Sequence, residues 1–343
     1  MYSESDIEGA VQAGALTPEA AAAFRRHVAA GHGEPAVDEE HFRLLTGFND
    51  IFVSIALVLL FAALAQIGGK LTPGLGGLFV AGAAWPLAEY FTARRRMALP
   101  SILLLLGFVG GIGAAVIGLA TTIWPNLHDN YVGGVFAVAG LAAAGAAALH
   151  WRRFVVPITV AAGTAALVAM VVGIVVVIAP AAKLLLFPML LVGGLAVFAV
   201  AMWWDMSDPQ RRTRRADVAF WLHLVAAPLI AHALFNLIGV FGAEMGVGVA
   251  VVVLAMYLAF GFVALAIDRR ALLVSSLAYV LYAMYALFRS AGAIELSAAF
   301  TAFVIGSALL TLSAFWHPIR RRVVATLGGL AMRLPPAQMA GVS

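Results

Sequence analysis

Residues 216–240 read ADVAFWLHLVAAPLIAHALFNLIGV, and this stretch decides the fold. It is long enough to cross a bilayer, which requires about 20 apolar residues. Polar and helix-bending residues nevertheless interrupt the apolar run, namely Trp221, His223, Pro228, His232 and Asn236. Polar groups at membrane depth are costly and usually face protein or water rather than lipid. We therefore expect a spanning helix that carries the most informative side chains of the chain.

The composition of the whole chain points to a membrane protein. Of the 343 residues, 63% are hydrophobic and only 11% are charged, whereas a soluble domain carries about 25% charged residues. The formal net charge of +4 does not indicate nucleic acid, because the basic residues occur in short clusters between apolar runs. The chain has no cysteine, which excludes disulfides, thiolate metal sites and cysteine nucleophiles.

Apolar segments of spanning length recur along the chain with short connections between them. They predict an all-α polytopic transmembrane helix bundle of about ten spans within residues 47–318, at about 50–68, 74–92, 100–124, 131–149, 154–179, 183–204, 217–240, 245–267, 271–288 and 295–316.

The basic residues alternate with these segments. If every segment crosses the bilayer, 18 of the 21 lysines and arginines fall on one side, and only Lys70, Lys183 and Arg289 fall on the other. The positive-inside rule then places both termini in the cytoplasm of a bacterial inner membrane. A miscounted segment would have destroyed this alternation.

Both ends of the chain are expected to lie outside the bilayer. Within residues 1–46, two short helices form a hairpin, the second of which begins with Thr17 as cap, Pro18 at the first position and Glu19 in the first turn. The hairpin is too small to hold a large core alone, so it packs on the membrane domain or binds a protein partner. Residues 319–343 predict an interfacial helix that Pro335 and Pro336 end.

Spans one to four resemble spans seven to ten at several points. Asp50 and Asp217 open spans one and seven, and an arginine-bearing end closes spans two and eight. Six spans separate the two copies, so they would share one orientation, as in parallel repeats of transporters. The alternative is that helices leaving the membrane on this side commonly end in an aromatic residue and arginine, because that pair anchors the interface.

Candidate ligand-contacting residues gather on the seventh and ninth spans. His232 and Asn236 are four residues apart and share a helix face. Tyr279 and Tyr282 belong to an aromatic stripe on span nine. These side chains predict a pathway wall for a cargo, with Trp221 and His223 as further candidates. The alternative for the polar residues of span seven is that they form interhelical hydrogen bonds that hold the bundle together. The alternative for the tyrosines is that they pack in the bundle with a hydrogen-bonded hydroxyl, or belong to an aromatic girdle at the membrane interface.

The remaining polar residues have simpler interpretations. His223, His150 and His317 lie near span ends beside tryptophans, which favours headgroup-level anchoring. A b-type haem needs histidines on facing helices, and because no paired pattern recurs within a span we expect neither cofactor nor metal. Helix capping explains Asp50 and Asp217, and pairing with the Arg94 cluster explains Glu89. Asp205, Asp208 and Asp268 fall in turns beside arginines. The middle of every span lacks a carboxylate, which disfavours a carboxylate-coupled pump.

No nucleotide-phosphate loop, HExxH motif or serine elbow is present, so no catalytic residue is assigned. We expect a carrier or channel-like protein for a small or amphiphilic molecule. One alternative is a membrane scaffold or sensor that binds a partner through the N-terminal hairpin. Another is an intramembrane lipid-modifying enzyme with His223 or His232 as base, although the sequence favours a non-enzymatic role. A homo-oligomer is compatible with the sequence.

The N-terminal segment GALTPEAAAAF (residues 14–24), followed by spans with very short loops, resembles a class of uncharacterised bacterial inner-membrane proteins. Members of that class combine a short helical hairpin with eight to ten spans. The resemblance implies this layout, and it carries over no functional residues and no activity.

Overall fold

The structure is a computed structural model. It describes residues 4–32, 48–128, 131–209, 211, 213–240, 247–290, 297–329 and 334. Two compact units are treated separately, the N-terminal hairpin and the membrane unit, by which we mean the described residues from Phe48 to Gly329. No described residue lies in a strand, and the predicted all-α fold is confirmed.

The N-terminal hairpin consists of α1 (Glu4–Gln12) and α2 (Pro18–His32). The Thr17 side-chain oxygen accepts a hydrogen bond from the Ala20 backbone N–H at 3.1 Å, which confirms the predicted cap. Ile7 and Ala21 are buried. The rest of the predicted linker, from residue 33 to residue 46, lies outside the described residues.

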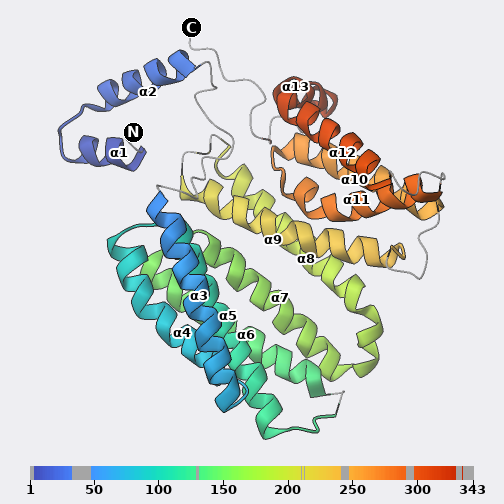
Figure 1. Cartoon of the computed structure of the whole chain (residues 1–343). Coiled ribbons are helices and arrows are strands. Elements are labelled where there is room, and N and C mark those ends of the chain that lie inside the picture. Colours follow the sequence, from blue (N-terminus) through green and yellow to red (C-terminus); the bar gives the residue numbers. More distant parts are fainter. Residues whose placement is uncertain are drawn as a thin grey trace. The chain divides into compact units, whose positions relative to one another are not determined.

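The membrane unit contains the predicted apolar segments as helices (Figure 1). Nine helical segments in the described part of the chain are long and apolar enough to cross a membrane, so the protein is an integral, multi-pass membrane protein. The α-helices of the membrane unit, including the shorter α4 and α13, are α3 (Phe48–Leu71), α4 (Leu75–Ala88), α5 (Ala98–Ile123), α6 (Val132–Phe154), α7 (Ile158–Ile178), α8 (Leu186–Met206), α9 (Arg214–Leu237), α10 (Val247–Ile267), α11 (Ala271–Ser290), α12 (Ser297–Ala314) and α13 (Trp316–Thr326).

The predicted second span, alone of the ten, is absent from the helices of spanning length in the described part of the chain. Its α-helical part, α4, has only 14 residues, and six residues of π-helix, η1 (Glu89–Arg94), continue it. The predicted segment 74–92 is therefore helical over most of its length but is not one uniform α-helix. A π-helical turn inside a helix shifts the register of the side chains that follow it, and here it carries Glu89 and Arg94.

Small residues allow the early helices to approach closely. A Cβ atom built on Gly77 of α4 would lie 2.5 Å from the Gly111 carbonyl oxygen of α5, and one built on Gly140 of α6 would lie 2.7 Å from the Ala166 carbonyl oxygen of α7. Neither position has room for a larger side chain without a backbone shift. Such contacts are typical of membrane helices, which associate through close packing rather than hydrophobic segregation.

Helix α9 contacts helices that precede it and helices that follow it in the membrane unit. It packs against α8 and α7, and on its other side against α11 (Figure 1). Its buried residues recur on several faces, including Leu222, Ala226, Ile230 and Phe235. A helix that is buried nearly all round lies inside a bundle, so the stretch chosen from the sequence is an interior element.

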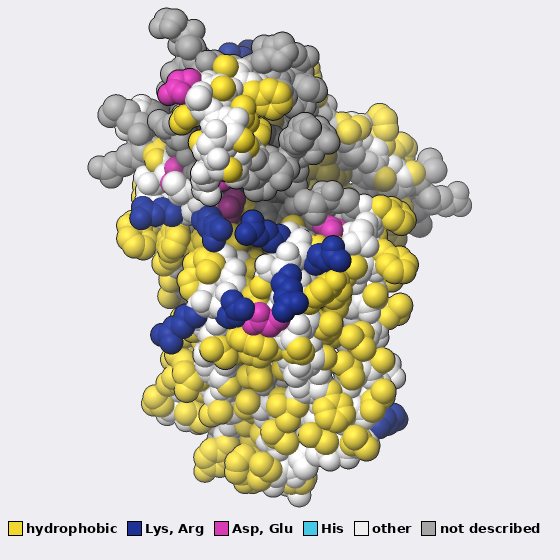
Figure 2. All heavy atoms as spheres, turned by 90° about the vertical axis from the view of Figure 1, so that its left-hand side faces the viewer, with side chains coloured by type: hydrophobic (Ala, Val, Ile, Leu, Met, Phe, Trp, Pro, Cys, Tyr) yellow, Lys and Arg dark blue, Asp and Glu magenta, His cyan; other side chains and the backbone are white. Residues whose placement is uncertain are grey.

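The arginine-rich ends of alternate spans meet one another. The Glu89 carboxylate at the start of η1 pairs with Arg153 at the end of α6, and Asp205 at the end of α8 pairs with Arg269 after α10. Figure 2 shows lysine and arginine side chains gathered in a band on one face, with an apolar surface beyond it. We call this side of the membrane unit the arginine-rich side.

The turns on the arginine-rich side share an uncommon backbone conformation. Arg96, Val155, Arg211 and Asp268 each have a φ between 51° and 60°. This left-handed region is disfavoured for residues that carry a Cβ atom. Each of these turns reverses the chain within a few residues, and the left-handed residue is the point at which the chain turns.

The predicted repeat of spans one to four as seven to ten stays a prediction. Helix α5 packs against α3, α4 and α6, and α11 likewise packs against α9, α10 and α12. The ends of spans four and ten, which would correspond in such a repeat, differ from each other. Trp151 lies inside α6, whereas α12 stops at Ala314 and Trp316 begins the separate helix α13.

Candidate functional site

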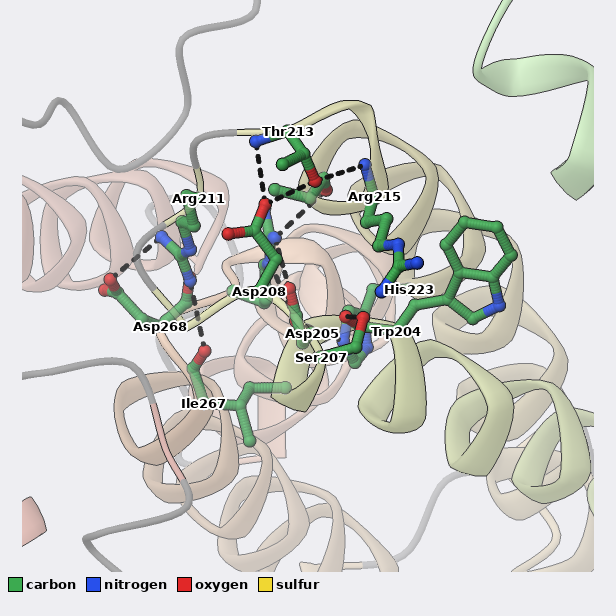
Figure 3. A network of polar contacts seen from close by, with 12 residues as sticks. Trp204, Asp205, Ser207, Asp208, Arg211, Thr213, Arg215, His223, Ile267 and Asp268 are labelled. Carbon is green, nitrogen blue, oxygen red and sulfur yellow. Dashed lines mark hydrogen bonds and ion pairs between the residues drawn. The ribbon is translucent and has the colours of Figure 1, made fainter.

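The arginine-rich end of α8 and α9 holds a buried carboxylate, Asp205, with two side-chain partners (Figure 3). Asp205 accepts a bidentate pair from Arg269, at 2.6 Å to Oδ1 and 3.2 Å to Oδ2. Its Oδ2 lies 2.9 Å from Nε2 of His223. Arg269 also donates to the Ala216 carbonyl oxygen of α9 at 3.2 Å. Asp205, His223 and Arg269 are each at most 3% exposed, so all three are removed from solvent.

A second buried carboxylate, Asp268, continues the network. Its Oδ2 accepts from Arg211 at 3.1 Å, and its Oδ1 accepts from the Trp316 indole N–H at 2.9 Å and lies 3.3 Å from Arg320 Nε. Arg211 also donates to the carbonyl oxygens of Asp268 at 3.1 Å and Ile267 at 3.4 Å. Trp316 and Arg320 belong to α13, so this carboxylate fastens the last described helix to the rest of the unit.

The loop between α8 and α9 is shaped to hold Arg211 in place. Asp208 Oδ2 accepts from the Thr213 backbone N–H at 2.8 Å and from the Thr213 hydroxyl at 2.7 Å. The Thr213 hydroxyl in turn accepts from the Arg215 N–H at 3.3 Å and caps α9. The Asp208 carbonyl oxygen accepts from the Arg211 N–H at 2.9 Å. Figure 3 shows Arg211 turned from this loop toward Asp268.

The charges of this buried network nearly balance. We call the side chains of Asp205, Arg211, His223, Asp268, Arg269, Trp316 and Arg320 the inner network; it contains three guanidinium groups and two carboxylates. Burial lowers the pKa of Arg211, with Arg269 acting in the same direction and Asp268 opposing the shift. Arginine nevertheless stays protonated in proteins, so three buried positive charges face the two carboxyl groups.

One nitrogen of His223 has no hydrogen-bond partner among the described residues. Nε2 faces Asp205, whereas Nδ1 is buried without a partner, and the Phe198 ring lies 5.2 Å from the imidazole centroid. If Nε2 carries the proton and donates to Asp205, Nδ1 keeps an unused lone pair. Within the described part of the chain, His223 is therefore hydrogen-bonded to the inner network through one ring nitrogen only.

A second polar group lies farther along α9 and matches the predicted pathway residues. His232 Nδ1 is 2.6 Å from the Tyr279 hydroxyl of α11, and His232 Nε2 is 3.3 Å from Asn236 Nδ2. Asn236 also donates to the His232 carbonyl oxygen at 3.2 Å. The Phe235 ring stacks on Tyr279 at 4.3 Å, and Phe187 of α8 lies 5.8 Å from His232. His232 itself remains exposed. We call His232, Asn236 and Tyr279 the α9 polar cluster.

The six predicted site residues thus separate into three groups. His232, Asn236 and Tyr279 come together. His223 is buried in the inner network, and Trp221 is buried at 8% exposure, so neither shares a surface with His232. Tyr282 is exposed at 48%, one helical turn from Tyr279. The expectation that His223 is a headgroup-level anchor is wrong, and its burial does not suit the base of a water-accessible enzyme.

Two other expectations near the span ends also need correction. His150 is fully buried, its Nδ1 lies 3.2 Å from the Thr159 hydroxyl, and its ring packs against Phe154 at 4.6 Å. It is a packed core residue and not a headgroup anchor. Glu89 pairs with Arg153 of α6 through two contacts at 2.8 and 2.6 Å, and not with the adjacent Arg94 cluster. Glu89, the first residue of the π-helical turn, thus connects that turn to a neighbouring helix.

Sequence reasoning missed the inner network because its partners are far apart along the chain. Asp205 and Arg269 are separated by 64 residues, and Asp268 and Trp316 by 48. A signal was nevertheless present, since Asp205 ends α8 and Asp208 follows it in one arginine-rich connection, and Asp268 lies in the next. Three acidic residues in two neighbouring connections at one level of a bundle, with a histidine at the same depth, predict cross-helix pairing.

Known proteins add no residue assignments. In the part of the chain that the structure describes, no group of three or more histidine, aspartate or glutamate side chains could hold a metal ion. No protein-family model, no curated protein and no solved structure matches this chain.

Proposed function

We propose that the protein is a carrier for a small amphiphilic molecule in a bacterial inner membrane, with both termini in the cytoplasm. One observation carries this proposal: a single interior helix, α9, bears both polar groups with a proline between them. His223 ties α9 to the inner network, His232 belongs to the α9 polar cluster, and Pro228 separates the two. The two histidines are nine residues apart, about 13 Å along the helix axis.

Pro228 gives α9 a place to bend. Proline lacks the N–H that would bond to the carbonyl of Leu224, and its ring disfavours a straight helix at that point. Carriers commonly use interrupted helices near the bilayer middle to bind cargo and to change which side of the site is open. A bend at Pro228 would move the His232 end of α9 relative to the end that the inner network holds. The inner network then acts as the fixed end of this motion.

The α9 polar cluster favours an amphiphilic cargo. It offers an imidazole, an amide and a phenol hydroxyl, and the aromatic rings of Phe187 and Phe235 flank it. Because His232 is exposed on a helix of spanning length, a ligand can reach it from the surrounding bilayer. A molecule with one hydrogen-bonding head and an apolar body suits this combination, whereas a hydrated ion does not.

The test uses purified protein in proteoliposomes and three fluorescent amphiphiles: a labelled fatty acid, a labelled phospholipid and an amphiphilic cation. We expect at least one probe to cross faster in vesicles that contain the protein. His232→Ala and Tyr279→Phe should abolish the increase while leaving the thermal unfolding midpoint in detergent unchanged. Tyr282→Phe is the matched control, because Tyr282 is on the same helix and outside the α9 polar cluster.

Pro228→Ala tests the bend itself. It should slow the same probe and raise the unfolding midpoint, because alanine restores the missing backbone hydrogen bond. The proposal fails if protein-free vesicles match protein-containing ones for all three probes, or if Tyr282→Phe is as damaging as Tyr279→Phe. Equal losses of transport and of thermal stability in His232→Ala would assign the cluster to packing.

A second candidate role concerns the N-terminal hairpin. Phe24 is 46% exposed and Leu16 is 37% exposed on this small unit. Exposed apolar side chains on a small helical unit are typical of a protein-binding surface. We propose that this surface binds a protein partner, in which case the full-length protein with Phe24→Asp should lose a cross-linked adduct in cells that the Glu19→Gln control retains.

A further inference from the structure

A shallow groove on the arginine-rich half of the membrane unit combines an apolar floor with one cationic end. It has a volume of about 150 Å³ and runs between α11 and α12. Aliphatic side chains form its walls, including Val274 and Leu277 of α11 and Leu309 of α12. Arg270, Ser313 and Trp316 lie where α11 begins and α12 ends, so they mark the arginine-rich end of the groove.

The Arg270 guanidinium is held in place at that end. It lies over the Trp316 ring at 4.6 Å from the centroid. Trp316 is 1% exposed, and its indole N–H is bonded to Asp268, so the ring is fixed by the inner network. Cation–π stacking uses the face of the guanidinium, and its N–H donors lie in the guanidinium plane, along the edges. Arg270 is exposed, so its side chain reaches the surface at the head of the groove.

We propose that this groove binds an anionic phospholipid, with its phosphate on Arg270 and one acyl chain along α11 and α12. Guanidinium and phosphate form paired charge-assisted hydrogen bonds, and the exposed Ser313 hydroxyl lies beside them at the same end. From Arg270 to Leu277 the groove extends about 10 Å toward the bilayer middle, in the direction that an acyl chain takes from its phosphate.

The adjoining cavity supports the same assignment. An apolar space of about 290 Å³ lies on the α10 side of α12 and shares Leu273, Leu309 and Leu312 with the groove. The arginine-rich half of α12 is therefore flanked by unfilled apolar volume on both sides. A lipid chain that fills the groove would support α12 against α11. This inference does not depend on the carrier proposal, since it uses neither His232 nor Pro228.

The experiment is native mass spectrometry of the full chain in detergent, titrated with phosphatidylglycerol or with phosphatidylcholine. We expect one phosphatidylglycerol to bind ahead of the others and to bind more tightly than phosphatidylcholine. Arg270→Gln should weaken that first step about tenfold, the loss expected for one bidentate charged contact. Leu277→Trp should weaken it as well, because the indole fills the groove while leaving Arg270 in place.

The matched control is Arg152→Gln, another exposed arginine on the same side, which does not line this groove. Binding by Arg152→Gln should equal that of the unmodified protein. The assignment is overturned if Arg152→Gln and Arg270→Gln lose affinity equally, since the lipid would then be responding to general surface charge. It is also overturned if Leu277→Trp binds as tightly as the unmodified protein, or if the two lipids bind alike.

Discussion

At the scale of single residues, two arginine–carboxylate pairs of similar geometry lie in opposite surroundings. Asp205 and Arg269 are buried, at 2% and 4% side-chain exposure, whereas Glu89 and Arg153 are 35% and 53% exposed. Removing one partner of a buried pair leaves an uncompensated charge, while an exposed pair is screened by solvent. The chain therefore contains its own comparison between a buried and an exposed ion pair.

Asp205→Asn should destabilise the protein by about 3–5 kcal/mol, because the amide keeps the shape but leaves the Arg269 charge buried without a counter-ion. Glu89→Gln, the matched control, should change stability by about 0–1 kcal/mol. Thermal unfolding midpoints of the two variants in one detergent provide the measurement. Equal shifts in the two midpoints would contradict a structural role for the inner network.

The individual site residues were only partly predictable. The spacing of His232 and Asn236 places them on one face of α9, and the structure adds Tyr279 to the same cluster. The burial of His223 was not predictable, because its partner Asp205 comes from another helix. A sequence pattern reports neighbours along one helix, whereas burial depends on the helix that packs against it.

At the scale of secondary structure, α6 presents two glycines with opposite surroundings. A Cβ atom on Gly140 would meet the backbone of Ala166 and Met170 of α7 at 2.7 Å, whereas one on Gly145 would meet nothing within 4 Å. Both positions are helical, so alanine has the better helix propensity at each. The local packing alone distinguishes them.

Gly140→Ala should lower stability by about 1–3 kcal/mol, because the added methyl forces α6 and α7 apart. Gly145→Ala should be neutral or stabilising by up to about 1 kcal/mol, since it loses no contact and gains helix propensity. Unfolding in detergent followed by circular dichroism would measure both. If the two substitutions had the same effect, close packing of α6 on α7 would not be what stabilises this pair.

The helices themselves were the most predictable part of the molecule. Nine of the ten expected segments are helical over a spanning length, because an apolar run of that length has few other stable conformations in lipid. One of the nine opens with a 3-10 helix, Pro180–Leu185, before α8 begins. The remaining segment, residues 74–92, contains the π-helical turn of η1, which hydropathy cannot distinguish from an α-helix. The short helix α13 was expected to begin near residue 319, and it begins at Trp316.

At the scale of the whole molecule, the basic residues predict the orientation of the membrane unit. Fusions of alkaline phosphatase, which is active only outside the cytoplasm, should be active after residue 128 and inactive after residue 154 or at the C-terminus. The reason is that arginines 94–96 and 152–153 flank the spans before and after residue 128, and clusters of arginine stay on the cytoplasmic side of the membrane. Fluorescent protein fusions at the same sites should give the reverse pattern. An active phosphatase at the C-terminus would contradict both the orientation and an even number of crossings.

The inner network also has a consequence for how the chain is made. Asp205 leaves the ribosome 64 residues before Arg269, and Asp268 leaves it 52 residues before Arg320. During synthesis Asp205 therefore enters the insertion machinery before Arg269 exists, and Asp268 enters it with Arg211 already made but before Arg320. A nascent chain that stalls before Trp316 retains Arg211 as the partner of Asp268 but lacks both contributions of α13. Such truncated products should be less stable than the full chain, because the buried Asp268 then lacks its contacts with Trp316 and Arg320.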